Sequence, residues 1–368
     1  MFGEYVRRFF SRLLANIDLG LFGIVLPLLL IGLATVFSAT YDTGSRVFSH
    51  LLNMAVGLGV MWGAAQCPPQ RLMRFSLPLY GVGIILLVLV FPLGVVVNGA
   101  RRWLSLGIIR IQPSEIFKIA TPLMLAWYFH KYEAVLSLRH YVVAFLLLLV
   151  PFALIARQPD LGTAILVGAA GFYVIFFAGL PWKVMGGMLA AAAAAAPFFW
   201  SVLHDYQRRR ILTLLDPTTD PLGAGYHIIQ STIAIGSGGP YGKGWLAGTQ
   251  THLEFIPERH TDFIFAVFAE EHGLLGAVIL LTLYALLILR GLMIAANAST
   301  LFSRLLAGSI TLSFFTYAFI NMGMVSGILP VVGVPLPFMS YGGTALVMLF
   351  LGIGILMSIQ SHRSLNRR

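Results

Sequence analysis

Residues 253–262, Leu-Glu-Phe-Ile-Pro-Glu-Arg-His-Thr-Asp, contain three acids, an arginine and a histidine, and they directly precede a long apolar run that begins at Phe263. Charge next to such a run is typical of the start of a membrane helix. Helical spacing from Asp262 reaches Glu270, so both carboxylates are expected on one face of this helix. The other members of that face are small, which favours close packing inside the protein: Ala266, Ala269, Gly273 and Gly276.

Asp262 is the first candidate for a functional residue. An ionisable side chain near hydrocarbon is costly to bury, and such a residue is by default a functional-site hypothesis. A structural salt bridge or a favourable acid at a helix N-terminus would also place an aspartate there. The residues alone leave these interpretations open.

The composition predicts an integral membrane protein. Of 368 residues, 58% are apolar and 10% are charged, whereas a soluble domain has roughly 25% charged residues. A crossing needs about 20 apolar residues. We therefore expect an all-α, single-domain bundle over residues 1–368, with ten transmembrane helices near 19–38, 48–66, 76–96, 115–131, 140–157, 162–179, 182–203, 263–290, 305–325 and 342–361. A large extracytoplasmic loop at 204–262 separates the seventh and eighth.

The charge pattern bears on partners and orientation. Basic residues give a net charge of +10 but are spread along the chain, so nucleic acid is rejected as a partner. A cytoplasmic N-terminus places just over half of the 24 Lys and Arg residues inside, and an even helix count returns the C-terminus to the cytoplasm. Arg7, Arg8 and Arg12 precede the first apolar run, which we expect to remain as an uncleaved anchor. The single cysteine excludes an intrachain disulfide.

Two further clusters precede the large loop. Arg101 and Arg102 lie in a mixed basic and apolar connection that suits contact with anionic headgroups. Glu115 and Lys118 share a helix face, as a functional pair or a structural bridge. A functional role is favoured over a structural one. Burying two charges costs more free energy than their attraction returns unless the geometry of the pair is excellent. Asp160 is a further candidate, for which capping of the sixth helix is the structural alternative.

The large loop carries a glycine-rich run from Gly236 to Gly244 that includes Lys243. A Walker A motif is excluded, because Ser237 stands where glycine is required and Gly244 follows the lysine. Backbone amides with Lys243, Arg208 and Arg210 would still suit a phosphate, and a flexible loop is the alternative. Near the C-terminus, the Pro- and Gly-broken run 331–343 is a candidate wall for a lipid-binding groove, or ordinary loop packing.

Several segments resemble motifs of the SEDS family (shape, elongation, division and sporulation) of peptidoglycan glycosyltransferases. They are Asp216-Pro217, Gly225 to Ser231, Gly244-Trp245 to Thr249-Gln250, Pro257 to Ala266, Glu270-Glu271 and Val334 to Gly343. The resemblance extends over nearly the whole chain. Arg259 and the short N-terminal tail are similar to the elongation branch rather than to the division branch.

The resemblance implies polymerisation of lipid II into glycan strands at the outer face of the bacterial cytoplasmic (inner) membrane during elongation. Asp262 matches the essential aspartate of the family, and a carboxylate suits a base that takes the acceptor's 4-hydroxyl proton. Cations or a divalent metal, Mg²⁺ or Mn²⁺, would stabilise the undecaprenyl pyrophosphate leaving group; no other cofactor is expected. Residues expected to bind substrate or to support the base are Arg101, Arg102, Glu115, Lys118, Asp160, Arg208, Arg210, Lys243, Arg259, His260 and Ser340.

The resemblance also implies partners from the elongation machinery, above all a class B penicillin-binding protein that crosslinks the glycan. Small residues suggest a docking surface for its membrane helix at Gly276, Ala277, Gly308, Ser309 and Ser313. The main alternative function is a lipid II flippase that uses Glu115, Lys118 and Glu270 as a relay, although no clear inverted repeat is found. A noncatalytic scaffold for cell-wall enzymes is a third hypothesis. Such a scaffold would not need a charged external loop beside a lipid-binding groove.

Overall fold

The computed structural model describes residues 16–40, 44–97, 100–105, 107, 110–202, 205–220, 223–253, 255–256 and 258–363. Expectations that rest on the N-terminal arginines 7, 8 and 12, on Glu254 or on Pro257 lie outside these residues. The long helices are α2 (Leu19–Ala39), α3 (Gly44–Ala65), α4 (Pro69–Leu93), α5 (Pro113–Lys131), α6 (Leu138–Ala156), α7 (Leu161–Phe177), α8 (Trp182–Val202), α12 (Ile264–Ala296), α13 (Leu301–Val325) and α14 (Thr344–Ser361).

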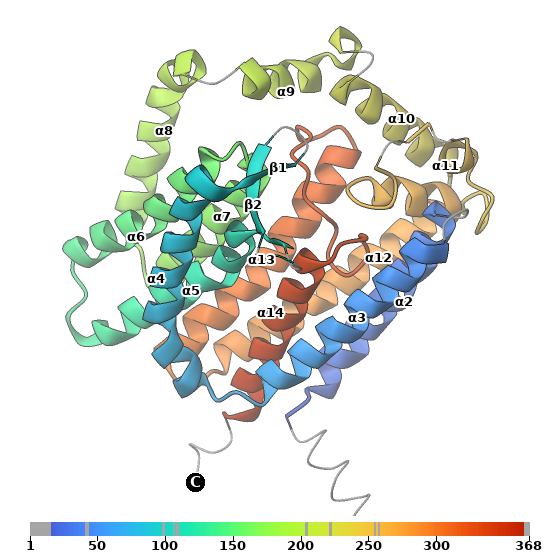
Figure 1. Cartoon of the computed structure of the whole chain (residues 1–368). Helices are drawn as coiled ribbons and strands as arrows, with labels where there is room; N and C mark the ends of the chain where they lie inside the picture. Colours follow the sequence, from blue (N-terminus) through green and yellow to red (C-terminus); the bar gives the residue numbers. More distant parts are fainter. Residues whose placement is uncertain are drawn as a thin grey trace, which may run out of the picture.

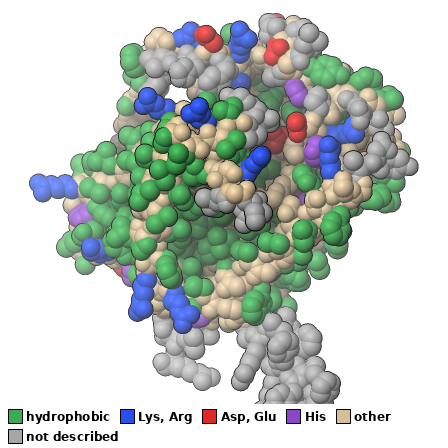
Figure 2. Space-filling view, in the orientation of Figure 1, with side chains coloured by type: hydrophobic (Ala, Val, Ile, Leu, Met, Phe, Trp, Pro, Cys, Tyr) green, Lys and Arg blue, Asp and Glu red, His purple; other side chains and the backbone are tan. Residues whose placement is uncertain are grey.

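A helix occupies each of the ten predicted ranges. Among the described residues, seven helices are long and apolar enough to cross a membrane, namely α2, α3, α4, α6, α12, α13 and α14. The chain is therefore a multi-pass helical protein, and the number of crossings stays a prediction. The middle of the face in Figure 2 is largely hydrophobic, with charged side chains mostly above and below it, as expected for a bundle that lies in a bilayer.

Helix α13 lies in the middle of the bundle and packs against α12, α7 and α5 (Figure 1). Small residues allow these close contacts. A Cβ added at Gly291 of α12 would lie 2.3 Å from Oγ1 of Thr311 on α13. On the other side of the bundle, α14 packs along α3, where Gly57 faces the ring of Phe350. Backbone approach at small residues is the usual way in which membrane helices associate.

A short antiparallel sheet was not expected. Strands β1 (Val95–Val97), β2 (Ala100–Ser105) and β3 (Arg110–Ile111) pair in the order β1-β2-β3 between α4 and α5. Pairing satisfies backbone groups that an extended chain would otherwise leave open near the membrane. The arginine-rich connection predicted from sequence is therefore a small sheet.

The large loop is mostly helical. It contains α9 (Asp205–Leu215), the 3₁₀ turn η2 (Pro217–Thr219), α10 (Ala224–Ser237) and the short α11 (Thr249–His252). In Figure 1 these elements arch from α8 over one end of the bundle to the start of α12. Helix α10 packs against α12. The loop thus caps the end of the bundle at which Asp262 lies.

Two expectations about α12 were wrong. Asp262 does not belong to the helix, which begins at Ile264 after Phe263, so it does not share a helix face with Glu270. The helix is also broken at Gly273, where φ is +63° and ψ is −159°. The predicted small face is nevertheless buried from Ala266 through Gly276. Helical spacing therefore predicted the buried face correctly within the helix. Extending the same spacing back across the start of the helix to Asp262 was the error.

Candidate functional site

Asp262 lies in irregular chain at the capped end of the bundle, directly before α12. Its side chain is half-buried, and within the described residues it makes no hydrogen bond or ion pair. It faces Gly333 of the loop between α13 and α14, where an added Cβ would lie 3.3 Å from Oδ2. Gly333 has φ +73°, which favours glycine. A bare backbone position therefore leaves space beside the carboxylate.

The surroundings of Asp262 favour the protonated form. Burial and, secondarily, the negative charge of Glu258 raise the pKa of Asp262 from 3.8 to about 6. The group is thus mostly ionised at pH 7 and more basic than an ordinary aspartate. A carboxylate that has no internal partner and a raised pKa is suited to accept a proton.

The backbone that leads up to Asp262 is held by the loop that follows α13. Oγ of Ser340 donates to the carbonyl oxygen of Thr261 at 2.7 Å and accepts from the amide of Leu336 at 2.7 Å. The amide of Tyr341 donates to the carbonyl oxygen of His260 at 2.8 Å. The predicted groove wall therefore packs directly on the segment that carries the candidate base.

His260 and Arg259 flank this segment in different ways. The His260 ring lies 5.7 Å from the Tyr341 ring, and burial, with the positive charge of Arg46, lowers the pKa of His260. Nε of Arg259 donates to the carbonyl oxygen of Ala39 at 2.7 Å, and Nη1 donates to that of Thr251 at 3.0 Å. Arg259 thus ties the end of α2 to α11 while keeping its charge near the site.

His227 of α10 is a neighbour that the sequence interpretation did not select. Its ring stacks on Phe263, the residue after Asp262, with centroids 5.4 Å apart. Burial lowers its pKa, although the charges of Glu258 and Asp220 oppose this effect. The Gly225 to Ser231 motif was a signal for this position, but spacing alone gave it no partner.

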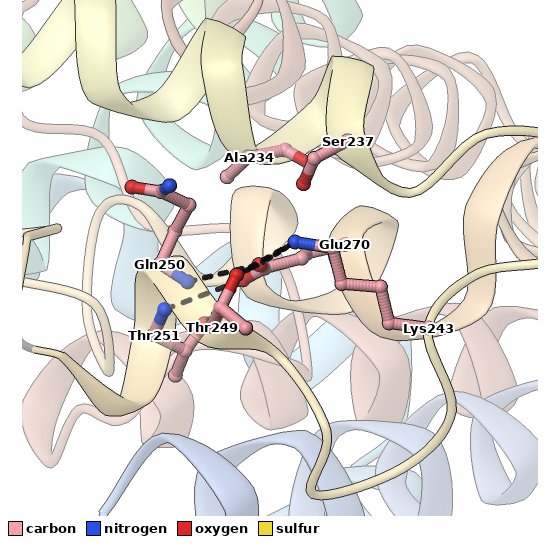
Figure 3. A network of polar contacts seen from close by, with 7 residues as sticks. All are labelled: Ala234, Ser237, Lys243, Thr249, Gln250, Thr251 and Glu270. Carbon is pink, nitrogen blue, oxygen red and sulfur yellow. Dashed lines mark hydrogen bonds and ion pairs between the residues drawn. The ribbon is translucent and has the colours of Figure 1, made fainter.

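Glu270 is fully buried on α12 and fixes the short helix α11. Its carboxylate accepts from Nζ of Lys243 at 2.8 Å, from the amide of Gln250 at 2.9 Å and from Oγ1 of Thr251 at 3.0 Å (Figure 3). The amide of Thr251 also donates to it, at 3.3 Å. A buried carboxylate satisfied by several donors is stable where it stands. Glu270 is therefore a structural anchor in this conformation.

The glycine-rich turn packs against the break in α12. The amides of Lys243 and Gly244 donate to the carbonyl oxygens of Glu270 and Glu271, each at 3.0 Å, and the amide of Leu274 donates to that of Gly239 at 2.9 Å. A Cβ at Gly242, where φ is +82°, would lie 2.1 Å from the oxygen of Glu271. The amides of Lys243 and Gly244 are thus occupied within the protein. The turn is therefore a structural joint, and these two amides are not open to the phosphate that the sequence suggested as one possibility.

Glu115 and Lys118 form a buried ion pair on α5. Their charged atoms are 2.6 Å apart, and each side chain is 8% exposed. Nζ of Lys118 also lies 5.1 Å above the ring of Tyr317 on α13, a favourable cation–π arrangement. The pairing of these two residues is confirmed, whereas its role in activity stays a prediction.

A second buried cluster centres on Asp160. Asp160 caps α7 by accepting from the amide of Thr163 at 3.3 Å, and it accepts from Nε2 of Gln112 at 2.8 Å. Arg102 lies 3.9 Å away and also donates to the carbonyl oxygen of Pro159. Arg101 instead donates to the carbonyl oxygen of Phe91 at 3.1 Å. The capping interpretation of Asp160 is confirmed, and Arg102 joins it.

The arginines of α9 do not join the Asp262 segment through any contact seen among the described residues. Arg208 donates to the carbonyl oxygens of Trp200 and Ser201, at 3.0 and 2.6 Å, and so caps the end of α8. Arg210 is half-buried on the same helix. Both lie on the arch above the bundle, α9, in Figure 1.

The described residues hold no group of three or more His, Cys, Asp or Glu side chains placed to share a metal ion. Among the residues that the structure describes, Asp262 and Glu258 are the carboxylates that we assign to the candidate site. A divalent cation there would need ligands from the substrate or from water.

The docking surface predicted for a partner helix was wrong in part. Gly308 and Ser309 face α7 inside the bundle, where Ser309 is fully buried and donates to the carbonyl oxygen of Ala170 at 2.7 Å. Small residues permit close helix packing, but their positions in the sequence do not identify the helix that packs against them. An apolar groove of about 350 Å³ opens instead between α12 and α13, lined by residues that include Leu281, Phe315 and Phe319.

These features define a polytopic membrane protein with a candidate site around Asp262 at one end of its helical bundle. Comparison with known proteins identifies the family. The chain belongs to the FTSW_RODA_SPOVE family of cell cycle proteins, whose model matches residues 15–365. The resemblance stated from the sequence is thereby confirmed.

Curated relatives share most of their length with the chain. Peptidoglycan glycosyltransferase MrdB of Escherichia coli K12 is 54% identical over 343 residues, which are 93% of each protein. A probable peptidoglycan glycosyltransferase FtsW of Coxiella burnetii is 36% identical, covering 91% of this chain and 93% of the relative. The higher identity to MrdB agrees with the elongation branch.

Solved structures share the fold. A chain from a structure described as the structural coordination of polymerization and crosslinking by a peptidoglycan synthase complex matches with a TM-score of 0.83 and 36% identity, covering 94% of this chain and 98% of that one. The rod shape determining protein RodA of Thermus thermophilus matches with a TM-score of 0.72 and 30% identity, covering 94% and 97%.

Proposed function

We propose that this protein is a peptidoglycan glycosyltransferase that polymerises lipid II at the outer face of the cytoplasmic membrane, with Asp262 as its general base. The names of the relatives support the reaction class. The observation that carries the assignment of the base is the half-buried carboxylate of Asp262, which has no partner among the described residues and has a pKa raised to about 6. It lies beside the irregular loop expected to border a lipid-linked substrate.

The reaction forms one glycosidic bond. Asp262 takes the proton of the 4-hydroxyl on the acceptor sugar, and the oxygen attacks the anomeric carbon of the donor chain. The bond from this carbon to the pyrophosphate oxygen breaks, and undecaprenyl pyrophosphate leaves with the electron pair. The leaving group is already stabilised by its phosphates, so the chief protein contributions are the base and nearby positive charge.

Two of the candidate cations are paired with carboxylates. Lys243 is engaged by Glu270, and Arg102 by Asp160, so these side chains support the fold around the site. Arg259 lies three residues before Asp262 and is the cation we assign to the pyrophosphate region, with the α9 residues Arg208 and Arg210 as further contacts from above. His260 and Ser340 act by shaping the Asp262 segment.

We further propose ten crossings, with both termini in the cytoplasm and the cap formed by α9 to α11 outside. Helices at all ten predicted ranges support the even number. At the end of the bundle away from the cap, Arg290 pairs with Asp18 at 2.5 Å and links the ends of α12 and α2. Partial excess of Lys and Arg on that side supports the orientation.

A transpeptidase partner completes the synthesis, because this chain carries no recognisable transpeptidase site. A structural relative belongs to a complex that coordinates polymerization and crosslinking. We assign the single membrane helix of a class B penicillin-binding protein to the apolar groove between α12 and α13. Its apolar lining suits a lipid-embedded helix better than the buried Ser309 does.

The flippase alternative is less well supported. A relay needs groups that can release and accept protons, but Glu270 is held by Lys243 and by the amides of Gln250 and Thr251. Purified protein supplied with lipid II in detergent distinguishes the two functions. Glycan polymer forms there if the protein is a polymerase, because no second compartment is needed. Transport of lipid II in vesicles without any polymer in detergent would support the flippase instead.

A further inference from the structure

Asn321 lies near the end of α13 and is fully buried. Its Nδ2 donates to the main-chain oxygen of Asp262 at 2.8 Å and to that of Val334 at 2.7 Å. Because both partners are carbonyl oxygens, which only accept, the orientation of the amide is fixed with its two protons toward them. One side chain thus joins the residue that carries the base to the loop that faces it.

The main chain at Asp262 depends on such long-range contacts. Asp262 precedes α12 and has no place in its hydrogen-bond ladder. Local bonds are few, with the amides of Thr261 and Phe263 donating to the carbonyl oxygen of Glu258 at 3.1 and 3.3 Å. Ser340 holds the preceding residue, Thr261, and Asn321 holds Asp262 itself.

The second hydrogen bond of Asn321, to Val334, holds the loop that faces the Asp262 carboxylate. Val334 follows Gly333, whose backbone lies beside Oδ2 of Asp262. The amide of Asn321 therefore fixes the separation between the carboxylate and the backbone at Gly333 that lies against it. Movement of either carbonyl group by about 1 Å would alter the space in which an acceptor hydroxyl meets the base.

We propose that Asn321 is a positioning residue for glycosyl transfer, which acts by holding the main chains of Asp262 and Val334 together around the base. The proposal rests on the proposed function, because Asp262 is the base there. Asn321 does not touch substrate in this account. Without its two donors, the carbonyl groups lose buried partners and the segment relaxes toward water.

Replacement by a side chain of similar size without donors tests the role. In Asn321→Leu, we expect kcat for lipid II polymerisation to fall by about 10²-fold, the effect of a misplacement of roughly 1 Å, with a smaller change in KM. The carboxylate becomes better solvated, so its pKa falls from about 6 toward 3.8. The acid limb of the rate against pH should therefore move to lower pH.

A matched control separates positioning from loss of stability. Ser309→Ala removes another fully buried hydrogen bond of α13, to Ala170, without touching the Asp262 segment. It should retain the parental kcat and acid limb. If Asn321→Leu fails to fold, Asn321→Ser, which keeps one donor on a shorter side chain, replaces it. That variant should be intermediate in kcat with its acid limb also lowered.

The outcomes distinguish the positioning role of Asn321 from the assignment of Asp262 as the base, on which that role rests. If Asp262→Asn, measured in parallel, polymerises lipid II at the parental rate, the proposed base is wrong. If Asp262→Asn is inactive while a folded Asn321 variant keeps the parental kcat and acid limb, only the positioning role of Asn321 is overturned. A fall in kcat with an unmoved acid limb, matched by Ser309→Ala, would also overturn it, since that pattern reports general destabilisation.

Discussion

Lys243 and Glu270 form an ion pair with 2.8 Å between Nζ and Oε1, and this pair joins the glycine-rich turn to α12 on the side where α11 begins. Glu270 is fully buried, whereas the Lys243 side chain is 26% exposed. The carboxylate also receives the amides of Gln250 and Thr251. The glycine-rich turn and α11 therefore both depend on the side chain of Glu270.

We predict that Glu270→Gln destabilises the protein by about 3 kcal/mol, since removal of one member of a buried pair leaves the other uncompensated. Thermal unfolding in detergent measures the loss, and hydrogen exchange at residues 249–253 should increase. Glu133→Gln is the control, because Glu133 pairs with His130 at the surface. Equal unfolding temperatures for Glu270→Gln and the parent would contradict this role.

Asp262 itself should limit stability. The unfolded carboxyl ionises near pH 3.8 and the folded one near pH 6, so the folded protein is progressively disfavoured as pH rises between these values. Asp262→Asn should therefore raise the free energy of unfolding at pH 7 by at most about 3 kcal/mol, and by less because the group is half-buried; the unfolding temperature rises with it. The difference should vanish below pH 3.8. A variant less stable than the parent at pH 7 would refute the raised pKa.

Glu115 and Lys118 should act as one unit. Breaking the pair leaves a buried charge and costs about 3–5 kcal/mol. Glu115→Gln and Lys118→Met should each impair activity and stability, and the double variant should lose less than their sum. A double-mutant cycle measures the coupling. Strictly additive effects would show that the 2.6 Å contact carries no energy.

Photocrosslinking locates the partner helix. Probes at Leu281 and Phe315, which are 52% and 44% exposed on the groove between α12 and α13, should capture the membrane helix of the transpeptidase. A probe at Ala144 on α6, buried away from this groove, serves as the control and should capture none. Capture from probes on α3 or α4 alone would place the partner elsewhere.

The membrane fold was largely predictable because about 20 apolar residues are needed for each crossing, whatever their neighbours. Asp160 before α7 and the pair at Glu115 and Lys118 were also recognisable, since capping and i,i+3 spacing are local rules. Asp262 was identified by chemical type and by the family resemblance.

Tertiary contacts set the limit of the prediction. Helical spacing placed Asp262 on α12, but the helix starts two residues later and breaks at Gly273, where the turn around Gly242 supplies the missing partners. From the sequence, Lys243 was interpreted as a cation available to the substrate. In the structure it is bound to the carboxylate of Glu270, 27 residues away. Asn321 gave no signal, because its two partners come from separate loops.

The most direct test is the rate of lipid II polymerisation by purified Asp262→Asn beside the parent protein. Asparagine preserves the shape of the side chain but does not accept the hydroxyl proton. The rate should fall by about 10²–10⁴-fold, while the amount of folded protein stays the same and its unfolding temperature rises. Polymerisation at the parental rate by the folded Asn variant would contradict the assignment of Asp262 as the base.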